Sequence, residues 1–172
     1  ELYKKAEITV KEVSDLCSLA ESVYKKFNDS EWATNLYYKA EKMAKDSPDC
    51  CGLADSLCEN LEDKKWAAKI YNKAENEAEH SYEFRWLADS ICKKLGEIEW
   101  AKKVYKKAEG KATFFYEFRR LAEHLCENMG DKEWAKKVYE KAEGKAESHR
   151  WCHDVTDLAD SIHKNLGDKE WA

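Results

Sequence analysis

Apolar residues recur along the chain at the spacing of one helical face. Between residues 82 and 95 they lie three or four positions apart, at Phe84, Leu87, Ala88, Ile91, Cys92 and Leu95. A second stretch separates an apolar face from a lysine face, with Trp100, Ala101, Val104, Tyr105 and Ala108 against Lys102, Lys103, Lys106 and Lys107. This spacing predicts two consecutive amphipathic helices.

The same pair of patterns repeats along the chain. The segment 130–143 recurs with few changes at 96–109, 62–75 and 28–41, and it begins again at Gly167. Its tryptophan stands at positions 32, 66, 100, 134 and 171, which gives steps of 34, 34, 34 and 37. A fixed period in this range is typical of a solenoid, in which each unit contacts only its neighbours.

We therefore predict an all-α fold, an α-solenoid of stacked antiparallel helix pairs with about ten helices. The whole chain, 1–172, is expected to form a single array. Its units are a half unit at 1–11, full units at 12–45, 46–79, 80–113 and 114–147, and a partial final unit at 148–172. The final unit carries a three-residue insertion within 148–154, and an insertion in a repeat maps to a loop on one face.

Short polar segments separate the predicted helices. Gly96, Gly130 and Gly167 follow the first helix of their units, where Gly adopts the left-handed conformation at little cost. An aspartate that can cap the second helix comes next in four units, at Asp29, Asp63, Asp131 and Asp168. In the second helices, we expect the recurring Trp and Tyr to fill the space between units.

Composition narrows the class of protein. Apolar residues make up 43% and charged residues 38%, and the net charge is −5, so the chain is expected to be soluble and helix-favouring. The acidic balance argues against a nucleic-acid partner. No window approaches the run of about 18 to 20 apolar residues that spans a bilayer, and no leader opens the chain, so we expect neither a membrane partner nor export.

The cysteines follow the repeat. Cys58, Cys92 and Cys126 occupy the same position in successive units. A residue type that repeats at one structural position is expected to fill a half-buried helix site and not to form disulfides. This pattern predicts a reducing, cytoplasmic location.

At these residues the chain resembles the tetratricopeptide repeat, a helix-turn-helix unit of 34 residues. The residues that carry the resemblance are Phe84, Leu87, Ala88 and Ile91 with Ala101, Tyr105 and Ala108, and again Phe118, Leu121, Ala122 and Leu125 with Ala135, Tyr139 and Ala142. Three features depart from the family: the Gly turn comes one residue late, Ala replaces the usual Gly after Leu, and the closing Pro is missing. Sel1-like repeats therefore remain an alternative. Pentatricopeptide repeats have a similar length, but they bind RNA, which the acidic balance disfavours.

The resemblance implies that the first helices line a concave groove that receives a partner peptide or helix. Its exposed residues would include Asp55, Glu59, Tyr82, Arg85, Trp86, Asp89, Lys93, Tyr116, Arg119, Glu123 and Glu127. A charged surface with aromatic anchors suits such a partner, and an ordinary solvated face is the alternative.

Two local features add to this surface. Residues 46–62 carry five acids and no base, which either attract a basic partner segment or form a solvated helix face. The triplet Phe114, Phe115 and Tyr116 is either an anchor for a partner or packs against the next unit.

No stretch of the chain points to catalysis. It contains no Gly-rich phosphate loop, no nucleophile elbow and no His-Glu-x-x-His helix, so we expect neither an enzyme nor a cofactor. His149, Cys152 and His153 are weak candidates for zinc ligands, because imidazole and thiolate suit zinc, but no Cys-x-x-Cys pair accompanies them. We therefore expect no metal site.

The two ends of the chain suggest an alternative function. Joining Trp171 and Ala172 to Glu1, Leu2 and Tyr3 reproduces the internal pattern of the second helix, one residue short. A second copy could therefore stack head-to-tail on the first, which would make the chain a self-assembling repeat protein and a homo-oligomer.

Overall fold

The computed structural model describes residues 2–146, 152–167 and 171, and these residues are helical apart from the turns that connect them. The α-helices are α1 Leu2–Thr9, α2 Val13–Phe27, α3 Ser30–Met43, α4 Ser47–Ser56, α5 Lys64–Glu77, α6 Ser81–Ser90, α7 Ile98–Lys111, α8 Phe115–His124, α9 Lys132–Ala146 and α10 Cys152–Leu166. Three π-helical segments continue α4, α6 and α8, namely η1 Leu57–Leu61, η2 Ile91–Leu95 and η3 Leu125–Met129. The described residues form no strand, which confirms the predicted all-α class.

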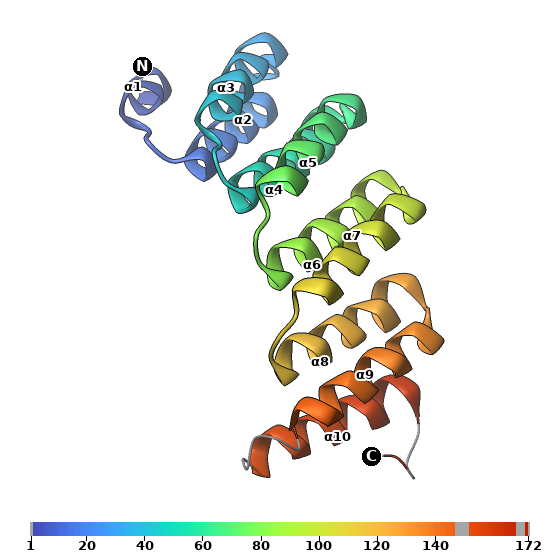
Figure 1. Cartoon of the computed structure of the whole chain (residues 1–172). Helices are drawn as coiled ribbons and strands as arrows, with labels where there is room; N and C mark the ends of the chain where they lie inside the picture. Colours follow the sequence, from blue (N-terminus) through green and yellow to red (C-terminus); the bar gives the residue numbers. More distant parts are fainter. Residues whose placement is uncertain (1, 147–151, 168–170, 172) are drawn as a thin grey trace. The chain divides into compact units, whose positions relative to one another are not determined.

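The chain divides into two compact units. The first consists of residues 1–78 with 94–96, and in it α2 packs along α3, and α4 packs along α5 (Figure 1). The second consists of residues 79–93 and 97–172, where α6 pairs with α7 and α8 pairs with α9. In this second unit α10 packs on both α9 and α8. Within each unit the helices thus form the stacked pairs that the periodicity predicted.

The second helix of each pair contributes the largest buried side chains. Tyr37, Tyr71, Tyr105 and Tyr139 are completely buried, and the alanines beside them are buried as well. The recurring tryptophans, in contrast, are only half-buried. The tyrosines therefore fill the interior, whereas the tryptophans lie partly exposed between consecutive second helices, where Trp66 contacts Tyr38 and Trp134 contacts Tyr105.

The tryptophans form a polar clamp between consecutive second helices. Four of the five recurring indoles donate through Nε1 to a glutamate in the preceding second helix, over 2.9 Å from Trp32 to Glu7, 3.0 Å from Trp66 to Glu41, 2.9 Å from Trp134 to Glu109 and 3.2 Å from Trp171 to Glu143. A lysine ammonium binds the same carboxylate in two cases, Lys39 at Glu7 and Lys141 at Glu109. Because an indole buries its ring and needs a partner for its N–H, the half-buried position and the glutamate belong together.

The helix ends follow the predicted chemistry. Gly96, Gly130 and Gly167 are left-handed, with φ of 76°, 63° and 75°. Asp29, Asp63 and Asp131 each accept a backbone N–H three residues on at 2.9 Å, as N-caps do, whereas Asp168 lies outside the described residues. Asn28 and Glu62 occupy the glycine position in earlier units and are also left-handed, with φ of 54° and 53°.

The π-helical segments are a feature that the periodicity did not predict. We expected one continuous helix over residues 82–95, but the structure divides it into α6 and η2. The wider turn changes the backbone hydrogen bonding, and at η1 the side chain of Asn60 donates to the carbonyl of Ser56 over 3.1 Å. Such turns are frequent at functional sites of helical proteins.

Replacing Glu62 by Gly should raise the free energy of unfolding by about 1 kcal/mol, because a residue with a Cβ is strained in the left-handed conformation. The matched opposite change is Gly130→Ala, where the added Cβ meets no atom within 4 Å and only the backbone conformation is disfavoured. Urea unfolding followed by far-ultraviolet circular dichroism measures both. Equal stability of Glu62→Gly and the parent protein would contradict the strain.

Candidate functional site

The candidate site is the surface formed by the first helix of each helix pair, and we call this surface the first-helix face. In the first compact unit it comprises α2 and α4, which contact each other. In the second it comprises α6, α8 and α10, where α8 contacts both of the others. All eleven residues that the sequence analysis assigned to a partner groove lie on α4, α6 and α8 or on the π-helical turns that follow them.

The assigned residues differ widely in exposure. Tyr82, Trp86 and Tyr116 are 41%, 49% and 49% exposed, and Glu59, Lys93 and Glu127 are exposed too. Asp55, Arg85, Arg119 and Glu123 are half-buried. Asp89 is buried, so its predicted exposure is wrong. The periodicity placed Asp89 on the correct face of α6, but it did not reveal what lies against that face.

Asp89 is the centre of a buried hydrogen-bond network. Its Oδ1 accepts from the hydroxyl of Tyr105 and, over 2.8 Å, from Nδ2 of Asn128. Its Oδ2 lies 2.5 Å from Nδ1 of His124. The other ring nitrogen of His124 is 2.8 Å from Nη1 of Arg85 and accepts that bond, because a guanidinium can only donate. Three helices and a π-helical turn therefore meet at one carboxylate.

Burial shapes the electrostatics of this network. It lowers the pKa of Arg85, although the Asp89 carboxylate acts in the opposite direction. It raises the pKa of Tyr105, and the charge of Asp89 raises it further. Burial and the negative charge of Asp89 therefore both favour the protonated form of the Tyr105 hydroxyl, which donates to Asp89.

The equivalent positions of the next helix pair carry a second network. Glu123 accepts from Nη1 of Arg119 over 2.7 Å and from the hydroxyl of Ser161 over 2.8 Å. That Ser161 hydroxyl also lies 2.8 Å from the hydroxyl of Tyr139, which accepts from Nδ2 of Asn165 over 2.9 Å. Glu123, with Arg119 bound to it, therefore joins α8 to α10 through Ser161.

The first compact unit repeats the motif in simpler form. The hydroxyl of Tyr71 donates to Asp55 over 2.5 Å, and the hydroxyl of Tyr37 accepts from Nδ2 of Asn60 over 3.2 Å. The sequence analysis missed this motif. A partial signal was present, since an acidic residue precedes each of the four tyrosines by sixteen positions, and two of these acids, Asp55 and Asp89, accept from the tyrosine hydroxyl.

The second compact unit carries four exposed aromatic side chains on α6 and at the start of α8, and we call them the aromatic patch: Tyr82, Trp86, Phe114 and Tyr116. Tyr82 packs edge-on against Trp86 with 5.2 Å between ring centroids. Phe114 and Tyr116 stack at 5.6 Å, and Phe114 is 51% exposed. Phe114 is thus exposed, whereas Phe115 of the same triplet is half-buried and packs edge-on against Tyr116.

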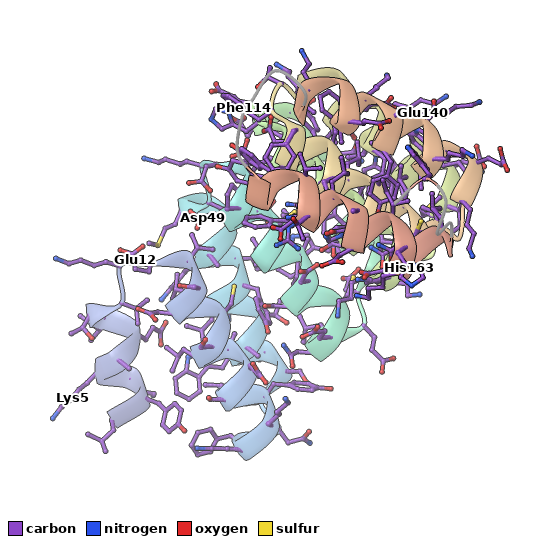
Figure 2. All side chains as sticks on the ribbon, turned by 90° about the horizontal axis from the view of Figure 1, so that it is seen from below. Lys5, Glu12, Asp49, Phe114, Glu140 and His163 are labelled. Atoms are coloured by element: carbon purple, nitrogen blue, oxygen red, sulfur yellow. The ribbon has the colours of Figure 1, made fainter. Side chains whose placement is uncertain are left out.

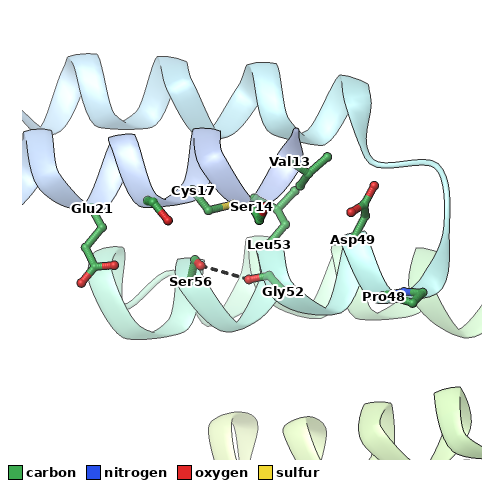
Figure 3. A pocket seen from close by; sticks show the side chains of 10 residues that line it. Val13, Ser14, Cys17, Glu21, Pro48, Asp49, Gly52, Leu53 and Ser56 are labelled. Atoms are coloured by element: carbon green, nitrogen blue, oxygen red, sulfur yellow. Dashed lines mark hydrogen bonds between the residues drawn. The ribbon is translucent and has the colours of Figure 1, made fainter. Parts of the chain in front are cut away.

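The first compact unit presents a cavity of about 270 Å³ between α2 and α4 (Figure 3). Its lining consists of Val13, Ser14, Cys17, Ser18, Glu21, Pro48, Asp49, Gly52, Leu53 and Ser56. The carboxylates of Glu21 and Asp49 stand at opposite ends of it. The ten lining residues include these two acids and no base.

Metal-binding groups and reactive thiols are the remaining candidate groups in the described part of the chain. No group of three or more His, Cys, Asp or Glu side chains there is arranged to hold a metal ion. His149 lies outside the described residues, and the side chains of Cys152 and His153 are not described either. Burial raises the pKa of both Cys17 and Cys50 to about 11, which leaves these thiols protonated and poorly nucleophilic.

Replacing Asp89 by Ala should lower the free energy of unfolding by about 2 kcal/mol, because Tyr105 and Asn128 would lose a partner inside the protein. Lys93→Ala, on the exposed part of the same first helix, is the control and should change it by less than about 0.5 kcal/mol. Adding Tyr105→Phe to Asp89→Ala should recover part of the loss, since the orphaned hydroxyl is then gone. Chemical denaturation of the four proteins measures this, and equal stability of Asp89→Ala and Lys93→Ala would contradict the structural role.

Comparisons with known proteins complete the description of the site. The chain matches no protein-family model, no curated protein and no solved structure. No helix among the described residues is both long and apolar enough to cross a membrane. The function is therefore argued from the first-helix face alone.

Proposed function

We propose that the chain is a non-enzymatic protein-interaction scaffold that binds a partner peptide or helix along the first-helix face. The observation that carries this proposal is the aromatic patch on the second compact unit. Four large aromatic side chains, Tyr82, Trp86, Phe114 and Tyr116, are between 41% and 51% exposed there. Exposed Tyr and Trp are the residues on which protein interfaces concentrate their binding energy.

The hydrogen-bond networks beneath the patch support the same function. Arg85 and Arg119 flank the aromatic side chains on α6 and α8, and each is held by a neighbour, at 2.8 Å from His124 and 2.7 Å from Glu123. A surface whose side chains are already ordered loses less conformational entropy when a partner binds. The two arginines would therefore lose little conformational entropy on binding.

The resemblance to tetratricopeptide repeats agrees with this proposal, since in that family the first helices receive the partner. We also propose a cytoplasmic location, because the cysteines Cys58, Cys92 and Cys126 repeat at one structural position, as free cysteines of a reducing compartment would. No cofactor, nucleic acid or membrane enters the proposal.

Selection of short random peptides displayed on phage against the immobilised protein tests the function. Peptides should be enriched, and Trp86→Ala should weaken their binding at least tenfold, the loss of about 1.4 kcal/mol that a central aromatic anchor causes. Ile98→Ala is the matched control, because Ile98 is 42% exposed in the same compact unit but lies on the second helix α7. Absence of enriched peptides, or equal losses in the two variants, would refute the proposal.

A specific observation also favours head-to-tail self-assembly as a second candidate. Leu2 on α1 is 79% exposed, whereas its counterpart Leu36 is completely buried. Val155 on α10 is 53% exposed, whereas its counterparts Phe84 and Phe118 are 5% and 6% exposed. Pairing of α10 of one copy with α1 of another would cover both of these exposed apolar side chains.

Leu2→Asp and Val155→Asp separate this candidate from the binding scaffold, because each places a charge on one of the two faces. In sedimentation velocity over a concentration series, the parent protein should form species larger than a dimer, and each variant alone should stay monomeric. An equimolar mixture of the variants should stop at a heterodimer, since one intact face of each kind remains. A parent protein that stays monomeric at high concentration would rule out self-assembly.

A further inference from the structure

The cavity between α2 and α4 exists because small residues occupy positions that are bulky elsewhere on the first-helix face. Arg85 and Trp86 on α6, and Arg119 and Arg120 on α8, stand where α2 has Cys17 and Ser18 and where α4 has Cys51 and Gly52. The large side chains cover the face in the second compact unit. In the first unit their absence leaves the cavity of about 270 Å³ open.

The lining of the cavity combines an apolar floor with acidic ends. Val13, Cys17 and Leu53 are buried and form the apolar part. Figure 3 shows Glu21 at the end of the cavity near Ser56, and Asp49 at the other end near Pro48. The hydroxyl of Ser56 donates to the carbonyl of Gly52 over 3.0 Å and so is already satisfied. The carboxylates of Glu21 and Asp49 are therefore the charged groups that a ligand would meet, beside the hydroxyls of Ser14 and Ser18.

The charge at the Asp49 end has no counter-ion. Among the described residues Asp49 forms no ion pair, and the charged groups that act on its carboxylate, Asp46 and Glu12, are acids as well. Burial raises the pKa of Asp49, and these two carboxylates raise it further. Figure 2 labels Asp49 and Glu12. At the other end Glu21 pairs with Lys25 over 2.5 Å, but both side chains are well exposed, so that pair is weak. An added positive charge would thus be attracted to the Asp49 end above all.

The size of the cavity limits what can enter it. Ligand pockets that enclose drug-sized molecules measure roughly 300 to 1,000 Å³, and this cavity of about 270 Å³ falls just below that range. A single long side chain suits it better than a whole cofactor. Lysine and arginine combine a long apolar stem with a cationic head, which matches an apolar floor with an acidic end.

We propose that the α2–α4 cavity receives a lysine or arginine side chain from an extended basic segment of the partner, with its stem on Val13 and Leu53 and its cationic head at Asp49. This inference rests on the proposed function, because it specifies the partner chemistry of the first-helix face in the first compact unit. An acidic segment would bring a like charge against Asp49, Asp46 and Glu12 and is disfavoured by the same Coulomb repulsion.

An amide NMR titration with the peptide acetyl-Ala-Lys-Ala-Lys-Ala-Lys-Ala-amide tests the inference, with the glutamate peptide of the same pattern as a counter-probe. The lysine peptide should shift amide signals of residues 13–21 and 49–56, and the glutamate peptide should not. Raising the salt concentration should weaken the binding, because partly exposed charges are screened.

Two variants test separately what the charge of the cavity and its free volume contribute to binding. Asp49→Asn should weaken binding of the lysine peptide roughly fivefold, the loss of one partly exposed ion pair. Gly52→Trp, which introduces the residue found at the same position in α6, should abolish binding while it keeps both carboxylates. The added side chain starts in open space, because a Cβ at Gly52 meets no atom within 4 Å.

Each variant has a matched control. Asp15→Asn removes the acid at the equivalent position of α2, which is exposed and outside the cavity, and should leave the affinity unchanged. Gly52→Ala should also bind normally. Asp49→Asn should unfold at no lower temperature than the parent, because the native surroundings disfavour its charged form, so a loss of binding cannot come from loss of fold.

The outcomes distinguish this inference from the proposed function. Equal affinities of the parent, Asp49→Asn and Gly52→Trp for the lysine peptide, or no binding of it, would overturn the cavity proposal. Phage-selected peptides that depend on Trp86 but carry no excess of Lys or Arg would do the same, and they would leave the binding scaffold intact. Failure to select any peptide would instead remove the proposed function.

Discussion

A tyrosine that is completely buried needs a partner for its hydroxyl, and this requirement governs the first helices of the protein. Tyr37, Tyr71, Tyr105 and Tyr139 fill the interior of successive units. A buried hydroxyl without a hydrogen bond costs about 1 to 3 kcal/mol, so each tyrosine requires a polar residue nearby. Carboxylates, amides and a serine hydroxyl of the first helices and their π-helical turns meet that requirement.

This requirement changes how the charged residues of the first-helix face are understood. Asp89, Arg119 and Glu123 look like contacts for a partner when they are read along the sequence, but the structure engages them in networks that join neighbouring helices. Their role in the structure is therefore to join neighbouring helices, whereas the aromatic side chains are the residues that stay exposed.

The two compact units use the same positions in different ways. In the second unit the positions that face outward hold aromatic residues and arginines, which gives the aromatic patch. In the first unit they hold serine, cysteine and glycine, and an acidic cavity opens between α2 and α4. Because the tyrosine motif and the Trp–Glu clamp secure the helix pairs in both units, the outward positions are free to vary. A framework that repeats from unit to unit thus carries outward residues that differ between units.

Local features of the sequence were sufficient to predict the helices and their ends. The helical spacing, the left-handed glycines at Gly96 and Gly130, and the caps at Asp29 and Asp63 all depend on residues within one or two helical turns of each other. Each was confirmed. The period of 34 likewise predicted that helices would pack as consecutive pairs, because amphipathic faces that repeat at a fixed spacing bury each other in order.

Tertiary structure decided which polar residues are buried and where space is left. The Asp89 network and the clamp between Glu109 and Trp134 join residues 16 to 39 positions apart, and their partners are known only once the helices are packed. An acid at helical spacing fits a solvated face and a buried network equally well. The cavity beside Asp49 is likewise a property of two packed helices. The sequence by itself therefore determined the helices and their order, because these follow from local periodicity, whereas packing alone determined which side chains are left on the surface.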